Sequence, residues 1–202
     1  MNISQLIGIT NFVSSGGGMT YATWNPTDKA AAITLSGGDL TATHSGGIDQ
    51  MVRATIGKSS GKWYWELTSV GMALEPNSTY GICKLTDSIN FQPGYGVDSY
   101  ALANGYGQTL HDFITLSFGG FASYTTALTD DTVTVGIALD MDAGTLTFYY
   151  NNVSQGVAFT GLSGTFYPCV GASGGYTLAT TANFGATPFT YTPPVGFSGL
   201  HT

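Results

Sequence analysis

Residues 131–162 read DTVTVGIALDMDAGTLTFYYNNVSQGVAFTGL, and this stretch decides the fold of the chain. Apolar side chains occupy every second position from Val133 to Leu139 and again from Leu146 to Tyr150. Such alternation lets one face of each segment pack against a core. A third short segment follows before Leu162. We therefore predict three consecutive strands, a β-meander.

The two breaks inside this stretch have the composition of tight turns. Asp140, Asp142 and Gly144 supply a short polar hairpin loop, and Asn151-Asn152 can adopt the positive φ angles of a two-residue type I′ turn. The first break also resembles the start of a calcium-binding loop, but the later glycine and glutamate of that pattern are missing. We predict turns here and no metal site.

Five stretches in order along the chain resemble the signature of the SPRY domain family. They are residues 61–66 (GKWYWE), 80–82 (YGI), the meander at 131–162, 167–170 (YPCV) and 183–189 (NFGATPF). One departure is Asn152, where many members of the family carry glycine. The resemblance covers about residues 21–197 and implies a concanavalin-like β-sandwich of the jelly-roll type.

Segment patterns outside the meander favour the same fold class. No segment shows sustained 3.6-residue periodicity, and short apolar runs alternate with turn residues from Tyr21 onward. We expect strands at 32–35, 39–43, 51–55, 62–70, 79–84, 113–118, 132–139, 145–150, 156–159, 166–171 and 180–184. So many short antiparallel strands predict an all-β fold, a two-sheet antiparallel β-sandwich. We assign residues 21–202 to this domain and residues 1–20 to an N-terminal arm with a Ser/Gly linker.

The charge of the chain excludes several classes of partner. Its net charge is −7, and it has five Lys and Arg residues among 202, so no basic stripe can neutralise phosphates. We expect no nucleic-acid partner. We also expect no membrane insertion, because no apolar stretch approaches the roughly 18 residues of a span. The first eight residues lack the basic start of a secretory signal, which predicts synthesis in the cytoplasm of the producing cell.

The two cysteines, Cys83 and Cys169, leave two interpretations open. The favoured one is a pair of buried thiols that act as small apolar groups. The alternative is a disulfide, which needs the two Cα atoms within about 7 Å of each other. Their spacing does not match a zinc site.

The aromatic residues between the expected strands are candidates for recognition. Tyrosine gives a large contact area and a hydroxyl at little entropic cost, and neighbouring Gly, Ser and Asn adapt the backbone around it. The predicted partner-binding residues are Tyr95, Tyr100, Tyr106, Phe121, Tyr124 and Tyr176. SPRY domains bind partners through inter-strand loops, so the resemblance supports this choice. The alternative is that about half of these rings cover the edges of the sandwich.

The N-terminal arm is a second candidate binding element. Residues 1–13 are mostly apolar, and a Ser/Gly-rich segment at 14–18 follows them. The predicted docking residues are Ile3, Leu6, Ile7, Ile9, Phe12 and Val13. Alternatively, the arm folds back onto its own domain.

Candidate catalytic groups are few. The histidines are His44, His111 and His201, the glutamates are Glu66 and Glu75, and no Gly-x-Ser-x-Gly elbow is present. The SPRY resemblance gives Glu66 a structural role. We therefore expect a non-enzyme with no catalytic residue, cofactor or metal, and a glycan-active enzyme is the least favoured function.

Low charge, abundant Gly and Thr and the apolar arm resemble bacteriophage SPRY proteins of the virion. This resemblance implies a virion structural protein, a capsid decoration or tail appendage, that docks on other virion proteins through its arm and forms a homo-oligomer on the particle. The alternative is a module on a tail fibre that binds a host-surface protein or glycan.

Overall fold

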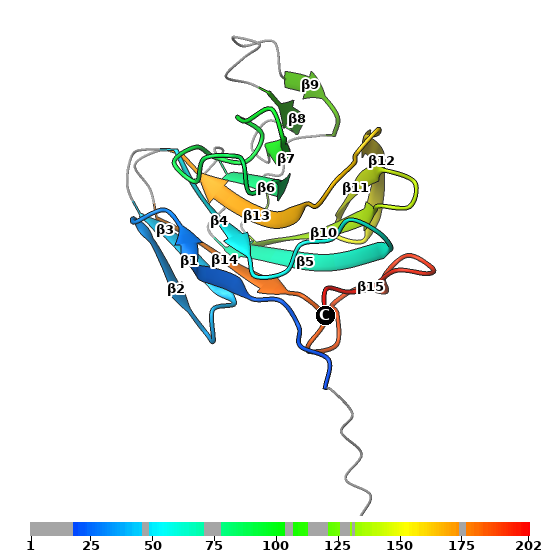
Figure 1. Ribbon diagram of the computed structural model, residues 1–202, viewed down its shortest axis with the longest axis horizontal. Helices are drawn as coiled ribbons and strands as arrows, with labels where there is room; N and C mark the ends of the chain where they lie inside the picture. The colour runs from blue at the N-terminus through cyan, green and yellow to red at the C-terminus, as the bar shows by residue number, and fades with distance from the viewer. Residues whose placement is uncertain are drawn as a thin grey trace, which may run out of the picture.

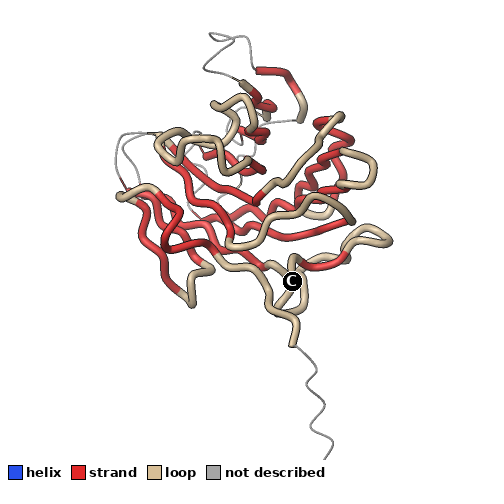
Figure 2. The backbone as a smooth tube through the Cα atoms, in the orientation of Figure 1, coloured by secondary structure: helices blue, strands red, loops and turns tan. Residues whose placement is uncertain are grey.

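The computed structural model describes residues 18–45, 49–70, 78–103, 107–112, 121–125, 130, 132–173 and 177–202. Within these ranges the chain forms strands, turns and loops and no helix (Figure 2). The strands belong to two sheets that lie one against the other (Figure 1).

The first sheet has seven strands. Their order is β1 (Trp24–Lys29), β4 (Gln50–Ala54), β13 (Tyr167–Ala172), β6 (Ser78–Cys83), β7 (Ser99–Ala103), β8 (Gln108–His111) and β9 (Phe121–Ser123). Every neighbouring pair is antiparallel.

The second sheet has eight strands. Their order is β12 (Val153–Phe159), β11 (Thr145–Tyr150), β10 (Thr132–Asp140), β5 (Lys62–Val70), β14 (Thr177–Asn183), β3 (Thr41–Ser45) and β2 (Ile33–Ser36), and the short β15 (Ser198–Gly199) pairs with β5. The β15 pairing is parallel and the others are antiparallel. The predicted all-β, two-sheet antiparallel sandwich is confirmed.

The meander lies at the centre of this fold. Ile137 of β10 stands opposite Phe148 of β11 on one side and Trp65 of β5 on the other, and all three side chains are fully buried. They belong to the main core between the two sheets. The period-two pattern of residues 133–139 therefore marks the core-facing side of β10, as predicted.

Both predicted turns of the meander are confirmed. Asp140 Oδ1 accepts the backbone N–H groups of Asp142 and Ala143 at 3.1 and 2.9 Å, so the carboxylate folds the loop. Asn151 and Asn152 have φ angles of 44° and 70°, as a type I′ turn requires.

Several strands were missing from the sequence-based assignment. The structure adds strands at 24–29, 99–103, 108–111, 121–123 and 198–199. β1 contains Pro26 and has an irregular register with β4, which removes the alternation that a regular strand would show. The other four are short, so local sequence carries little signal for them. The strand expected at 113–118 lies outside the described residues.

The two ends of the described chain meet. Tyr21 forms a β-bridge with His201, and the backbone N–H of Thr202 donates to the carbonyl of Thr20 at 2.9 Å. The predicted arm residues from Ile3 to Val13 lie outside the described residues.

The cysteines follow the favoured interpretation. Cys83 and Cys169 are both free and fully buried. The disulfide alternative is therefore wrong for this fold.

Candidate functional site

The segment between β6 and β7, residues 84–98, is the longest described connection without a strand of its own; we call it loop 84–98. It lies on the outer face of the first sheet. Ile89 packs on a small cluster that contains Met51, and Tyr95 packs on a second cluster that contains Leu110. The carbonyl of Ile89 also accepts the backbone N–H of Met51 at 3.0 Å. Loop 84–98 is thus attached to the sheet along its length.

A buried arginine holds the first half of this loop. Arg53 of β4 is 4% exposed, and its Nη1 donates to the carbonyls of Lys84 and Asp87 at 3.2 and 2.9 Å. Nε and Nη2 bind the carboxylate of Asp28 at 2.8 and 3.0 Å. Burial acts to lower the pKa of Arg53, but the bonds to Asp28 and Cys83 outweigh it and raise the pKa. The guanidinium therefore stays charged and binds the loop by charge-assisted hydrogen bonds.

The two ends of loop 84–98 are joined to each other. Lys84 Nζ forms an ion pair with Asp98 Oδ1 at 2.7 Å, and the Lys84 N–H donates to the Asp98 carbonyl at 3.1 Å. The bond from Lys84 lowers the pKa of Asp98. These contacts bring Leu85 and Val97, the next residues inward, to the same end of the loop.

Glycine allows the loop to approach the sheet closely. A Cβ on Gly94 would lie 2.4 Å from the Cβ of Leu110, and Gly94 has a φ of 91°. A Cβ on Gly171 would lie 2.6 Å from Cδ of Pro93. Both positions exclude larger residues, so the loop is fixed against the sheet by shape as well as by hydrogen bonds.

Loop 84–98 presents apolar side chains to solvent. Leu85, Phe91 and Val97 are 58%, 41% and 55% exposed; we call these three residues the loop patch. Apolar side chains held outward by a fixed backbone bind a partner without the entropic cost of ordering a loop. The arrangement can recognise another surface, and its hydrogen bonds and ion pairs serve to position it.

The predicted tyrosine set does not form one surface in the described chain. Tyr95 belongs to loop 84–98, and its side chain packs on the sheet against the cluster that contains Leu110. Tyr100 was expected in a loop, and this placement is wrong: it belongs to β7, contacts the main core and stacks on His111 with ring centroids 4.0 Å apart. Phe121 begins β9. Tyr106 and Tyr176 lie outside the described residues.

Tyr124 has a structural contact with the edge strand β12. The register between β11 and β12 shifts twice, and Gly156 in the irregular region has a φ of 85°. The hydroxyl of Tyr124 accepts the N–H of Phe148 at 3.3 Å and donates to the carbonyl of Gly156. It supplies hydrogen bonds that the bulged ladder lacks.

None of the three residues of the loop patch is in the predicted partner-binding set, which was chosen from aromatic residues, and Leu85 and Val97 are not aromatic. A usable signal was present: they are apolar residues at the two ends of a segment rich in Asp, Asn, Pro and Gly. Their exposure depends on the Lys84–Asp98 contact, which local sequence does not reveal.

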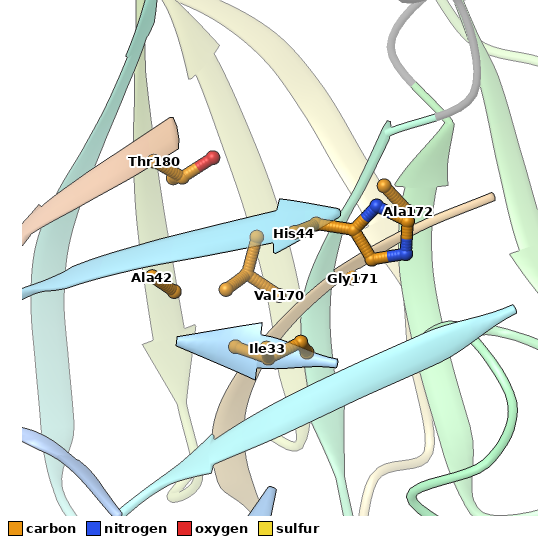
Figure 3. A pocket seen from close by; sticks show the side chains of 7 residues that line it. All are labelled: Ile33, Ala42, His44, Val170, Gly171, Ala172 and Thr180. Carbon is orange, nitrogen blue, oxygen red and sulfur yellow. The ribbon is translucent and has the colours of Figure 1, made fainter. Parts of the chain in front are cut away.

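A small pocket opens between the two sheets (Figure 3). Its lining residues are Ile33, Ala42, His44, Val170, Gly171, Ala172 and Thr180. His44 and Thr180 bring the polar side chains, and the Thr180 hydroxyl bonds to Ser69 Oγ at 2.7 Å. No carboxylate or thiol is among these lining residues.

No metal site of the usual composition is found in the described ranges. There, no group of three or more His, Cys, Asp or Glu side chains is placed to hold an ion. The described residues also contain no helix long and apolar enough to cross a membrane.

Comparison with known proteins identifies the fold family. The sequence profile of the SPRY domain matches residues 62–187, which include β5, β6, loop 84–98 and the meander. The chain belongs to the SPRY domain family. The match includes most of the residues that build the loop patch.

Three curated relatives of this SPRY chain are proteins of a fly, a frog and a fish. It is 25% identical over 183 residues to the E3 ubiquitin-protein ligase TRIM9 of Drosophila melanogaster, with 87% of this chain and 23% of that protein covered. Identity is 28% to Ran-binding protein 9 of Xenopus laevis and 30% to Ran-binding protein 10 of Danio rerio, with 83% of this chain covered in both and 31% and 28% of those proteins. The chain thus spans 23–31% of the length of these relatives.

Solved structures agree on the SPRY fold. The SPRY domain of human HERC1 superposes with a TM-score of 0.65 at 19% identity over 79% of this chain and 96% of that one. The PSpry domain of TRIM65 gives 0.62 at 20% identity, covering 80% and 92%. The SPRY-like jelly-roll sandwich is confirmed, and SPRY domains are generally protein-interaction modules.

Proposed function

We propose that this chain is a non-catalytic SPRY module that binds a protein partner through the loop patch. The observation that supports this most directly is the exposure of Leu85, Phe91 and Val97 on a segment whose backbone is anchored by Arg53 and by the Lys84–Asp98 pair. The fully buried cores of interfaces are more apolar than their rims and are enriched in aromatic residues such as Phe91.

A photo-crosslinking amino acid at position 91 tests the binding surface. The matched control carries the same amino acid at Val157, which is 56% exposed on the edge strand β12. We expect covalent capture of the partner protein from position 91 and none from position 157. Capture from position 157 alone would place the interface elsewhere on the sandwich.

A triple variant provides an independent measurement. Leu85→Ser, Phe91→Ser and Val97→Ser together remove the apolar contacts while leaving Arg53 and Lys84 in place. We expect loss of partner binding with an unchanged unfolding midpoint, whereas Val153→Ser with Val157→Ser leaves binding intact. Equal binding by both variants would exclude the loop patch.

For the partner itself, we propose another virion protein of the capsid or tail, and hence a location on the virus particle. The support comes from sequence: the low charge, the abundant Gly and Thr and the apolar residues 1–13 followed by a Ser/Gly linker. In the structure the first described residues lie beside the C-terminus of the same chain (Figure 1). The proposed arm is therefore joined to the domain at this end.

Deletion of residues 1–18 separates arm docking from the loop patch. We expect the shortened chain to fold and to be absent from purified particles, because the arm attaches the domain. Unchanged incorporation would overturn the arm as the docking element. A host-surface protein or glycan remains the alternative partner, and binding of the isolated domain to host envelope polysaccharide would favour it.

A further inference from the structure

Three sulfur-containing side chains converge beneath loop 84–98. Met51 of β4, Cys83 of β6 and Cys169 of β13 are each fully buried, and they make up all the buried members of a small core separate from the main one. The side chain of Ile89 covers them from the loop. None of these three residues has a part in the loop patch.

The sulfur atoms lie at the spacing of ligands to one small ion. Cys83 Sγ and Met51 Sδ are 3.7 Å apart, and the thiols of Cys169 and Cys83 are hydrogen-bonded to each other. A metal–sulfur bond of about 2.3 Å, as in zinc–thiolate sites, places three ligands in a plane roughly 4 Å from one another. The 3.7 Å between Cys83 Sγ and Met51 Sδ is close to this value.

Sheet register keeps the two thiols from forming a disulfide. Cys83 stands opposite Tyr167, and Cys169 stands opposite Gly81, so the cysteines are diagonal neighbours. Diagonal Cα atoms of an antiparallel pair are about 7–8 Å apart, beyond the usual reach of a disulfide. Both sulfurs stay available as separate ligands.

A positive charge lies beside the cluster. Arg53 Nη1 is 3.7 Å from Cys83 Sγ, and Arg53 remains charged through its bonds to Asp28. The guanidinium is therefore placed to balance negative charge at the cluster.

We propose that Met51, Cys83 and Cys169 form a site for a soft monovalent cation, Cu(I). Two thiolates and a thioether are ligands that Cu(I) prefers, whereas carboxylates and waters suit harder ions. Binding releases two protons: Cu⁺ displaces the thiol hydrogens of Cys83 and Cys169, and the thioether of Met51 adds without a change of charge. The resulting centre carries one negative charge, which the adjacent Arg53 stabilises.

Competition for Cu(I) tests the site under anaerobic, reducing conditions. The purified chain is titrated against a chromophoric Cu(I) chelator, both as the folded protein and after refolding from urea with Cu(I) present, so that the covering loop cannot block entry. We expect one Cu(I) per chain and an affinity that rises with pH, because two protons leave. Failure to retain Cu(I) by either route would overturn the proposal.

Variants distinguish Cu(I) binding at these three sulfur atoms from Cu(I) binding at histidine side chains elsewhere on the chain. Met51→Leu keeps the volume and removes one sulfur, and we expect roughly 10- to 100-fold weaker binding, the size of effect seen when a metal site loses a supporting group. Met141→Leu, a buried methionine in the main core, is the matched control and should bind as the unchanged chain does. Cys83→Ala with Cys169→Ala should abolish retention. Equal Cu(I) binding in that double variant would place the metal elsewhere and contradict the proposal.

Discussion

The carboxylate of Glu66 accepts the backbone N–H of Tyr191 at 2.8 Å, although 125 positions separate the two residues. Its other oxygen, Oε2, accepts the N–H of Thr190 at 2.8 Å. The hydroxyl of Tyr64 donates at 3.3 Å to Oε1, the oxygen that binds Tyr191. Glu66 is 1% exposed. One buried carboxylate on β5 therefore fixes the C-terminal segment across the outer face of the second sheet.

Glu66→Gln should weaken this attachment. The amide replaces one acceptor oxygen by an NH₂ group, which then faces a backbone N–H and leaves it without an acceptor. An unsatisfied buried donor costs about 1–3 kcal/mol, and we expect the free energy of unfolding to fall by that amount in urea. Asp39→Asn, the same carboxyl-to-amide change on the turn before β3, is the control. Equal losses in the two variants would contradict a specific role for Glu66.

The contrast between Glu66 and its partners shows how far the sequence predicts this fold. The resemblance of the GKWYWE stretch to the SPRY signature placed Glu66 in a strand with a structural role, and that signature is local. Its partners at 190 and 191 were not predicted, because no local pattern encodes a contact across 124 or 125 positions. The same holds for Arg53, which orders loop 84–98 from another strand.

The candidate site was less predictable than the sheets for a related reason. Tyrosine is enriched both at interfaces and at the rims of cores, so composition cannot separate Tyr100, which contacts the core, from a binding residue. Leu85 and Val97 are exposed because loop 84–98 packs on the sheet through other residues, Ile89 and Tyr95. That outcome depends on the completed sheet.

Tyr124→Phe should destabilise the edge strand β12 locally. The substitution removes the hydroxyl that accepts the N–H of Phe148 and donates to the carbonyl of Gly156, a loss of about 1–3 kcal/mol. Hydrogen exchange at the Phe148 amide should accelerate more than at Ile137 on the neighbouring strand. Tyr167→Phe, whose hydroxyl bonds to no described residue, is the control, and faster exchange in the control would argue for a general loss of stability.

Asp140→Asn should reduce the loss of folding stability that the chain shows as the pH falls. Burial acts to raise the pKa of Asp140, but the bonds from Lys62 and from the backbone N–H groups of Ala143 and Asp142 outweigh it, so the pKa lies below the usual value of 3.8. A lowered folded-state pKa gives stability that is present above the unfolded pKa and is lost as pH falls through the folded one. The variant should be less stable at pH 7 and should approach the unchanged chain below about pH 3. Urea unfolding at both pH values measures this, and a constant difference would contradict it.

Asp87→Asn should instead raise the folding stability at neutral pH, because the carboxylate of Asp87, a residue of loop 84–98, is buried. Its Oδ2 has no hydrogen-bond partner among the described residues, and burial raises its pKa above 3.8, with Asp98 adding to the rise while Arg53 and backbone N–H bonds oppose it.

A raised folded-state pKa means that ionised Asp87 opposes folding at neutral pH, and that this cost disappears as pH falls through the folded pKa toward the unfolded one. The neutral amide removes the cost, so the variant should unfold at a higher urea concentration than the unchanged chain at pH 7. The two chains should converge as the pH falls below the unfolded-state pKa of about 3.9, where the carboxyl is protonated in both states. Because Asp87 lies within loop 84–98, slower hydrogen exchange in that loop should accompany the gain at pH 7. A lower midpoint at pH 7 would show instead that the carboxylate is stabilised by Arg53 more than it is penalised by burial.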